Sequence, residues 1–149
     1  MKDRAVVIGL GNLYMRDDGI GIRVAKALKE KHPREDVSVH EHPEMDLTMI
    51  EKLQGASKVI VVDSVRGGKV PGTVSKYTLT RREDEARELP SLHSLKLHDI
   101  LDLAMSTGTL TCPVVIIGVE PRDDSLGEGL SPEVELAMPK AIEAVIREL

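Results

Sequence analysis

The sequence VVIGLGNLYMRDDGIG, residues 6–21, decides how the chain folds. It opens inside a β-branched apolar run, residues 5–8, which is typical of a buried strand. Gly9, Gly11 and Asn12 then predict a turn like the one after the first strand of a doubly wound fold. Up to Lys31 the apolar residues recur at helical spacing, which predicts a helix from residue 21. The chain is therefore expected to begin with a strand, a glycine turn, an acidic pair and a helix.

The acidic pair argues against a dinucleotide site at this turn. The G-x-G-x-x-G fingerprint needs a third glycine at position 14, where this chain has Tyr14. Asp17 and Asp18 stand just before the predicted helix, where two carboxylates would repel a pyrophosphate. Acids at this position can cap a helix or bind a cation. We expect Asp17 to be the cap and Asp18 to be the residue that binds.

The composition predicts a single globular domain over residues 1–149. A chain of this length can bury a sizeable core, and 41% of the residues are hydrophobic. Phe and Trp are absent and Tyr occurs twice, so the core is expected to be aliphatic. The same scarcity of aromatic side chains disfavours stacking on nucleic-acid bases.

Charge and cysteine content restrict the partners and the compartment. The net charge is −5 and the sequence has no basic cluster, which argues against nucleic acid as a partner. The sequence has no apolar run of membrane-spanning length and no signal peptide before the first strand. A single cysteine excludes an internal disulfide and fits a reducing compartment. We therefore expect a cytoplasmic protein that binds neither nucleic acid nor membrane.

Beyond the first helix, strands and helices follow one another along most of the chain. The sequence predicts strands at residues 37–41, 58–62, 73–79 and 114–119, and helices at 45–53, at 92–105 and after Ser131. The link over residues 63–72 is too short for a crossover helix, so the two strands that it joins are expected to run antiparallel. This order predicts an α/β fold, a three-layer α/β/α sandwich with a mixed, mostly parallel five-stranded sheet.

Two aspartates are expected to meet at one end of this sheet. Ligands of open α/β sheets bind beyond the carboxyl ends of the strands, where the strand order reverses. If the first and third strands are neighbours, Asp18 and Asp63 both lie near that crevice. Asp63 ends a run of Val and Ile, which suits either a ligand-binding acid or a residue that starts a turn. Both interpretations stay open at this point.

The predicted helix at 92–105 separates two histidines. His93 shares a face with positions 97, 100 and 104, so it is expected to point inward at the helix start. There it suits either a neutral metal ligand or a buried histidine with a satisfied hydrogen bond. His98 lies off that face and is interpreted as a surface residue or as one that supports a ligand from behind.

Two further histidines, His40 and His42, share one face at the end of the second strand. His42 can approach the site, but a solvated loop histidine is the favoured interpretation. Nucleophiles are poorly placed, because Cys112 precedes the last strand at the end opposite the crevice and Ser64 has no G-x-S-x-G elbow. Two aspartates and one imidazole instead make a mixed oxygen and nitrogen set, which suits borderline divalent ions with open coordination positions.

Six segments spread over nearly the whole chain form a specific combination, although each alone is a weak signal. They are Gly9–Asn12, Asp17–Gly21, Asp63-Ser64, His93, Gly118–Pro121 and Gly129–Val134. In this combination the chain resembles the nickel–iron hydrogenase maturation endopeptidases. The fold that the resemblance implies is an α/β/α sandwich with a mixed five-stranded sheet, in agreement with the order of elements.

The resemblance implies an endopeptidase that trims the C-terminal peptide from a nickel–iron hydrogenase large-subunit precursor after nickel insertion. It implies that Asp18, Asp63 and His93 are the metal ligands and grip the nickel that the precursor already holds. Zinc or cadmium could stand in for nickel. The resemblance does not identify the general base, for which Asp17 and Glu120 are the two residues considered.

The chain departs from the family pattern after its second strand. Many members carry Gly-Gly-Thr there, whereas this chain has Glu41-His42-Pro43-Glu44, in a loop that is expected to touch the substrate. Two other functions stay open. One is a non-catalytic metal-binding or nickel-chaperone module for hydrogenase assembly, which would use the same three residues. The other is a nucleotide-binding domain, which the missing glycine and the acidic pair disfavour.

Overall fold

Five strands form the middle layer of the protein, seen in a computed structural model that describes residues 4–43, 46–79 and 92–149. They are β1 (Ala5–Leu10), β2 (Val37–His42), β3 (Lys58–Ser64), β4 (Val74–Leu79) and β5 (Val114–Val119). Their order in the sheet is β2-β1-β3-β5-β4, and every neighbouring pair is parallel except β4 with β5. The predicted mixed, mostly parallel five-stranded sheet is confirmed.

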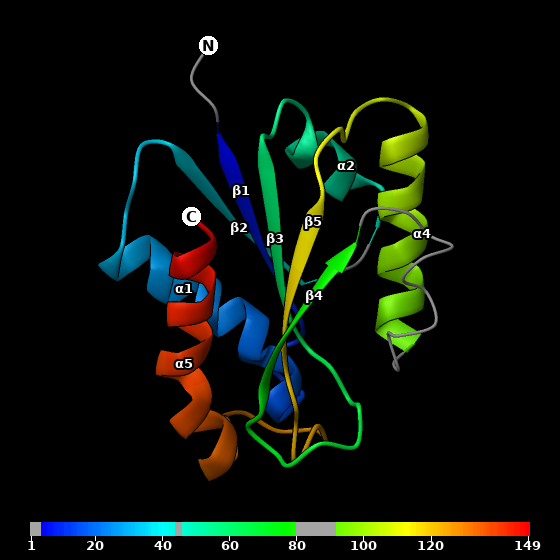
Figure 1. Ribbon diagram of the computed structural model, residues 1–149. Helices are drawn as coiled ribbons and strands as arrows, with labels where there is room; N and C mark the ends of the chain where they lie inside the picture. Colours follow the sequence, from blue (N-terminus) through cyan, green and yellow to red (C-terminus); the bar gives the residue numbers. More distant parts are fainter. Residues whose placement is uncertain (1–3, 44–45, 80–91) are drawn as a thin grey trace.

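Helices form the two outer layers (Figure 1). On one face of the sheet lie α1 (Ile20–Lys31) and α5 (Pro132–Glu148), and on the other lie α2 (Thr48–Leu53) and α4 (Leu92–Ser106). A short 3-10 turn, η1 (Arg16–Gly19), precedes α1. The predicted three-layer α/β/α architecture is therefore confirmed.

Side-chain alternation along β3 divides the core into two halves. Val59 and Val61 pack with the apolar residues of α2 and α4, whereas Ile60 and Val62 pack with those of α1 and α5. The strand is thus covered on both faces, as its unbroken β-branched sequence predicts. Continuing the alternation, Asp63 faces the α4 layer and Ser64 faces the α1 layer. The end of β3 therefore presents a polar side chain to each side of the sheet.

Gly9 and Gly21 bring α1 into backbone contact with the sheet. Gly9 lies inside β1 and not in the turn where the sequence analysis places it. A Cβ on Gly9 would lie 2.2 Å from the carbonyl oxygen of Gly21. A Cβ on Gly21 would lie 2.2 Å from the carbonyl oxygens of Leu10 and Val62. Only glycine fits at either position, and the start of α1 is pressed against the ends of β1 and β3.

The turn itself begins at Gly11, which has a φ of +134°. A Cβ there would lie 1.9 Å from the carbonyl oxygen of Asp18. This contact folds the β1–η1 loop back onto the acidic pair. Glycine is needed at position 11 both for its backbone angle and for the close approach.

Two strands and one helix differ in detail from the prediction. The third strand continues through Asp63 and Ser64, because both residues still pair with β5. Strands β3 and β4 run antiparallel as predicted, but β5 lies between them and pairs with both. The helix predicted at 45–53 begins at Thr48, and residue 45 lies outside the described residues.

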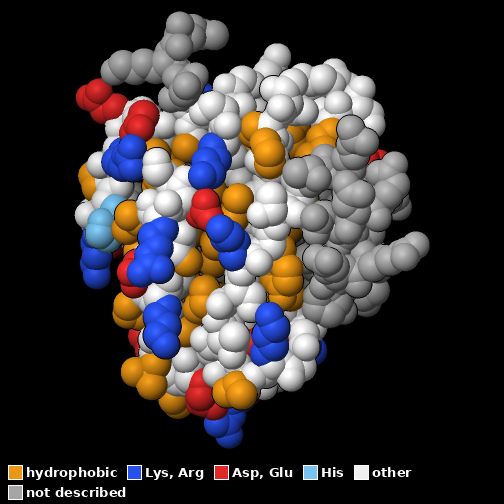
Figure 2. Space-filling model, viewed as in Figure 1, with side chains coloured by type: hydrophobic (Ala, Val, Ile, Leu, Met, Phe, Trp, Pro, Cys, Tyr) orange, Lys and Arg blue, Asp and Glu red, His pale blue; other side chains and the backbone are white. Residues whose placement is uncertain are grey.

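Two observations concern helix length and surface charge in the described part of the chain. Over residues 4–43, 46–79 and 92–149, no helix is long and apolar enough to cross a membrane. On the face shown in Figure 2, Lys and Arg side chains are spread among apolar and a few acidic ones.

Candidate functional site

Asp18 and Asp63 both lie at the carboxyl end of the parallel strands, and each bonds to Ser64. Asp18 belongs to η1, and its carboxylate accepts the backbone N–H of Asn12 at 2.9 Å and the hydroxyl of Ser64 at 3.3 Å. Asp63 is 3% exposed and accepts the backbone N–H of Ser64 at 2.8 Å. Ser64 therefore bonds to both carboxylates, and both aspartates lie near the end of β3, as the sequence analysis expects. Their role as ligands stays a prediction.

Asp17 does not cap α1, and that prediction is wrong. The N-cap position of α1 is Gly19, with no side-chain cap hydrogen bond. The buried Asp17 carboxylate instead accepts the backbone N–H groups of Arg122, Asp123 and Ser131, and also the Ser131 hydroxyl, at 2.7–2.9 Å. Ser131 occupies the N-cap position of α5, but its hydroxyl donates to Asp17 and makes no capping bond to the helix.

The backbone around Asp17 explains this orientation. The N–H of Asp17 donates to the carbonyl of Asp123, and the N–H of Arg16 donates to the carbonyl of Gly127, so η1 pairs with the β5–α5 loop. Figure 1 shows this loop and the β3–β4 loop at the end of the sheet where α1 begins. A side chain on the paired side of η1 meets the amides of the loop and not those of α1.

The charge state of Asp17 follows from this surrounding. Burial acts to raise the pKa of the Asp17 carboxyl, but hydrogen bonds from Asp123, Ser131 and Arg122 outweigh it and lower the pKa below its ordinary value. The Asp17 carboxylate is therefore ionised and accepts hydrogen bonds from four donors. Since a general base works best with a pKa near the operating pH, Asp17 is a poor base and a good loop anchor.

Glu120 anchors the other loop. It is buried just after β5, and its Oε1 accepts the backbone N–H groups of Gly67 and Lys69 at 2.9 and 3.0 Å. These bonds hold the β3–β4 loop beside the end of β3. Both residues guessed as the general base thus fix a loop through backbone amides.

Sequence reasoning missed the part played by Asn12. Its side-chain oxygen accepts the N–H of Tyr14 at 2.9 Å, while its own N–H donates to Asp18. This is an Asx turn, which Asn forms readily two residues before the bonded amide. The Gly11-Asn12 pair predicts a turn, but the bond to Asp18 depends on a contact that local sequence does not encode.

The histidine predictions have mixed outcomes. The backbone of His93 lies in the first turn of α4, but its side chain is outside the described residues, so its inward orientation is not tested. The face that it was predicted to extend is confirmed, because Leu97, Ile100 and Ala104 are buried. His98 is 4% exposed, so its interpretation as a surface residue is wrong. Helix α4 packs against α2 as well as the sheet, which the spacing of its own residues does not indicate.

His42 is also buried, at 5% exposed, and is not a solvated loop residue as predicted. Its Nε2 lies 3.2 Å from the hydroxyl of Thr48, the first residue of α2. The start of α2 therefore covers the end of β2, where His42 is paired with Leu10 of β1. Cys112 lies before β5, at the opposite end of the sheet, as predicted, and burial raises the pKa of its thiol.

The three predicted ligands cannot be compared as a set. Among the side chains that the structure describes, no group of three His, Cys, Asp or Glu residues forms a metal site. The His93 side chain lies outside the described residues, so the third predicted ligand is not tested. Of the predicted set, the structure shows Asp18 and Asp63 near the end of β3.

Comparisons with known proteins agree with this architecture. The family model described as hydrogenase maturation protease matches residues 22–148. A hydrogenase expression/formation protein, HoxM of Azotobacter vinelandii, is 30% identical over 149 residues, covering 93% of this chain and 70% of its own length. The hydrogenase 2 maturation protease of Escherichia coli K12 is 28% identical, covering 98% of this chain and 90% of its own.

Solved structures agree in both fold and sequence. The hydrogenase maturating endopeptidase HybD from E. coli superposes with a TM-score of 0.85 at 25% identity, covering 98% of this chain and 91% of its own. A hydrogenase 2 maturation peptidase from a Thaumarchaeota archaeon superposes with a TM-score of 0.77 at 34% identity, covering 98% and 97% of the two chains.

Proposed function

The chain belongs to the hydrogenase maturation protease family, whose members are peptidases, and from this premise we propose that it removes the C-terminal peptide of a nickel-loaded hydrogenase large-subunit precursor. In this proposal the nickel is part of the substrate. The enzyme recognises the bound metal and so cuts only a precursor that has been loaded.

The observation that carries the proposal is the position of Ser64 between two carboxylates. Its N–H bonds to Asp63 and its hydroxyl bonds to Asp18, which sets both acids at the open end of a parallel sheet. That end is where α/β folds bind their ligands. A buried acid such as Asp63 is costly unless it serves a partner or a ligand.

The donor set fits a borderline divalent ion. Two carboxylates with the imidazole of His93 make an oxygen and nitrogen set without thiolates, so tight retention of metal by the free protein is not expected. Zinc or cadmium should replace nickel in binding tests. When the precursor is bound, its nickel would polarise the scissile carbonyl or activate a water molecule. Asp17 and Glu120 are engaged by backbone amides, so the proposal gives neither the role of base.

The test begins with protease that has been treated with chelator and then freed of it. Nickel-loaded and nickel-free precursors are added separately, and mass spectrometry follows the loss of the C-terminal peptide. We expect cleavage of the loaded precursor alone. Binding with no change in precursor mass would favour the non-catalytic module. Rapid cleavage of nickel-free precursor without added metal would contradict recognition through nickel.

A second test concerns the third ligand. We expect His93→Ala to abolish processing and His98→Ala to leave most of it. The matched pair lies on one helix, and both variants remove an imidazole. Loss of processing in His98→Ala alone would transfer the predicted role to the second histidine.

A further inference from the structure

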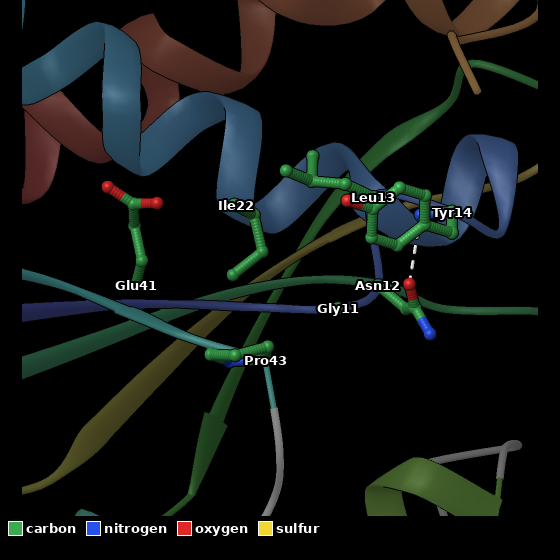
Figure 3. Close-up of a pocket in the computed structure, with 7 residues that line it drawn as sticks. All are labelled: Gly11, Asn12, Leu13, Tyr14, Ile22, Glu41 and Pro43. Carbon is green, nitrogen blue, oxygen red and sulfur yellow. Dashed lines mark hydrogen bonds between the residues drawn. The ribbon is translucent and has the colours of Figure 1, made fainter.

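An apolar pocket lies beside the loop between β1 and η1, which also contacts Asp18. Its volume is about 160 Å³, and its lining residues are Gly11, Asn12, Leu13, Tyr14, Ile22, Glu41 and Pro43. Figure 3 shows that they come from the β1–η1 loop, the first turn of α1 and the end of β2. Ile22 is buried, whereas the ring of Tyr14 is 64% exposed and forms part of the rim. The pocket is therefore open on the side of the loop.

Glu41 is the one acidic residue in the lining, and two lysines form ion pairs with its carboxylate. Each carboxylate oxygen of Glu41 lies 3.1 Å from a lysine ammonium, one from Lys26 and one from Lys29. Burial acts to raise the pKa of Glu41, but hydrogen bonds from both lysines lower it below the ordinary value. The carboxylate stays ionised and directed to α1, so what it offers the pocket is its aliphatic stem.

The pocket and the predicted ligand share one loop. Gly11 lines the pocket and also packs against the carbonyl of Asp18. Asn12 lines it and donates its N–H to the Asp18 carboxylate. A peptide chain lying across Asp18 would therefore pass the mouth of the pocket within a residue or two.

We propose that this pocket binds an aliphatic side chain of the precursor, from a residue close to the bond that is cut. The inference rests on the proposed function and names a specificity subsite for it. A cavity of about 150 Å³ with apolar walls accommodates a benzene molecule, so the volume suits one branched side chain such as leucine or isoleucine. A charged or amide side chain would lose much of its hydration against a lining that is mostly apolar.

The first experiment tests the pocket without cleavage. N-acetyl-leucinamide is titrated into isotope-labelled protein, and the amide signals of Gly11, Tyr14 and Ile22 are followed by nuclear magnetic resonance. We expect saturable shifts at these positions, and much smaller ones with N-acetyl-aspartamide. Tyr14→Ser should weaken the leucinamide response, whereas Leu136→Ser, an exposed apolar residue on α5, should not. Equal responses to the two probes would overturn the proposal.

The second experiment uses the precursor. Each aliphatic residue near the scissile bond is replaced in turn by asparagine. One replacement should lower kcat/KM about tenfold to a hundredfold, mainly through KM. With the Tyr14→Ser enzyme, the same replacement should lower kcat/KM much less, because the enzyme variant and the substrate variant each remove the same contact. Independent, additive effects would contradict the subsite. If wild-type protein cleaves no precursor at all, the proposed function fails, while the titration still decides whether the pocket selects aliphatic groups.

Discussion

Asp17 and Asp18 are adjacent in the chain, yet they serve two different regions of the molecule. Asp17 is fully buried and accepts four hydrogen bonds from the β5–α5 loop and the start of α5. Asp18 is partly exposed and reaches the ends of β1 and β3 through Asn12 and Ser64. The difference shows that two adjacent carboxylates of one motif can have different surroundings. Those surroundings decide whether a carboxylate holds a loop in place or lies at the open end of the sheet, where ligands bind.

The same contrast recurs across the sheet. Glu120 follows β5 and holds the β3–β4 loop through two backbone amides. Asp63 is the last residue but one of the neighbouring strand β3, on the face that carries α4. Two acids therefore fix loops and two acids form the candidate site. Substitutions that separate activity from stability test this division.

The largest expected effect is on activity. Asp63→Asn and Asp18→Asn keep the shape of the side chain but remove its charge, so each should lower the cleavage rate by more than about a hundredfold, the upper cost of losing a residue that only supports a ligand. The free energy of unfolding should change far less than the rate. Cleavage of nickel-loaded precursor and denaturant unfolding are measured on the same samples.

Glu143→Gln provides the control for this test, because it neutralises an exposed acid on α5 that pairs with Arg147. It should leave both quantities unchanged. If Asp63→Asn and Asp18→Asn both cleave precursor at the wild-type rate, the candidate site does not lie at these two aspartates.

Asp17→Ala should show the opposite behaviour. It leaves three backbone amides and one hydroxyl without their acceptor, and hydrogen bonds to a charged group contribute about 1.5–3 kcal/mol each. Since the effects are not additive and the loop can relax, we expect a loss of about 3–5 kcal/mol in the free energy of unfolding. Asp124→Ala, which removes an exposed ion pair with Arg66, should cost less than about 1 kcal/mol. Similar unfolding midpoints for the two variants would show that Asp17 is not an anchor.

The same anchor predicts a response to acid. Because the pKa of Asp17 is lower in the folded protein than in the unfolded chain, its contribution is complete above the unfolded value, about 3.9. It is lost as the pH falls through the folded value. The stability difference between wild type and Asp17→Asn should therefore be constant near neutral pH and shrink below about pH 4. Denaturant unfolding across that range measures it, and a difference that grows in acid would reverse the assignment.

The smallest expected effect is that of Ser64→Ala. The variant keeps the N–H that bonds to Asp63 and removes the 3.3 Å hydroxyl bond to Asp18. The acceptor is a carboxylate, but the bond is long and Asp18 is partly exposed, so we expect it to contribute only about 0.5–1.5 kcal/mol. The cleavage rate should therefore fall by roughly two- to tenfold. Steady-state rates on nickel-loaded precursor suffice to detect this. A loss as large as that of the aspartate variants would mean that the hydroxyl itself takes part in the chemistry.

Local sequence was sufficient for the elements and for locating the two aspartates at one end of the sheet. β-branched runs, glycines and helical spacing act over a few residues, and strand parallelism then carries Asp18 and Asp63 to one end of the sheet. The orientation of Asp17 could not be predicted in this way. Its partners lie 105 to 114 residues further along the chain, and they meet it only when the β5–α5 loop folds onto η1.

The burial of His42 and His98 was missed for a related reason. Helical and strand periodicity give the direction of a side chain but not what covers it. His42 lies 3.2 Å from Thr48, so the start of α2 covers it. His98 lies on α4, which packs beside α2. The error at His42 traces to the placement of one six-residue helix, whose packing depends on the whole layer.

The backbone contact between Gly9 and Gly21 has a consequence for how this fold can evolve. Most core contacts join two side chains, so a change in one can be offset by a change in the other. Here a methyl group on either residue would clash with a backbone carbonyl oxygen. Because every residue has that carbonyl group, a substitution elsewhere cannot remove the clash. Descendants of this sequence can therefore exchange the loops and the pocket that choose a substrate, while the two glycines stay fixed and keep the acidic turn against the sheet.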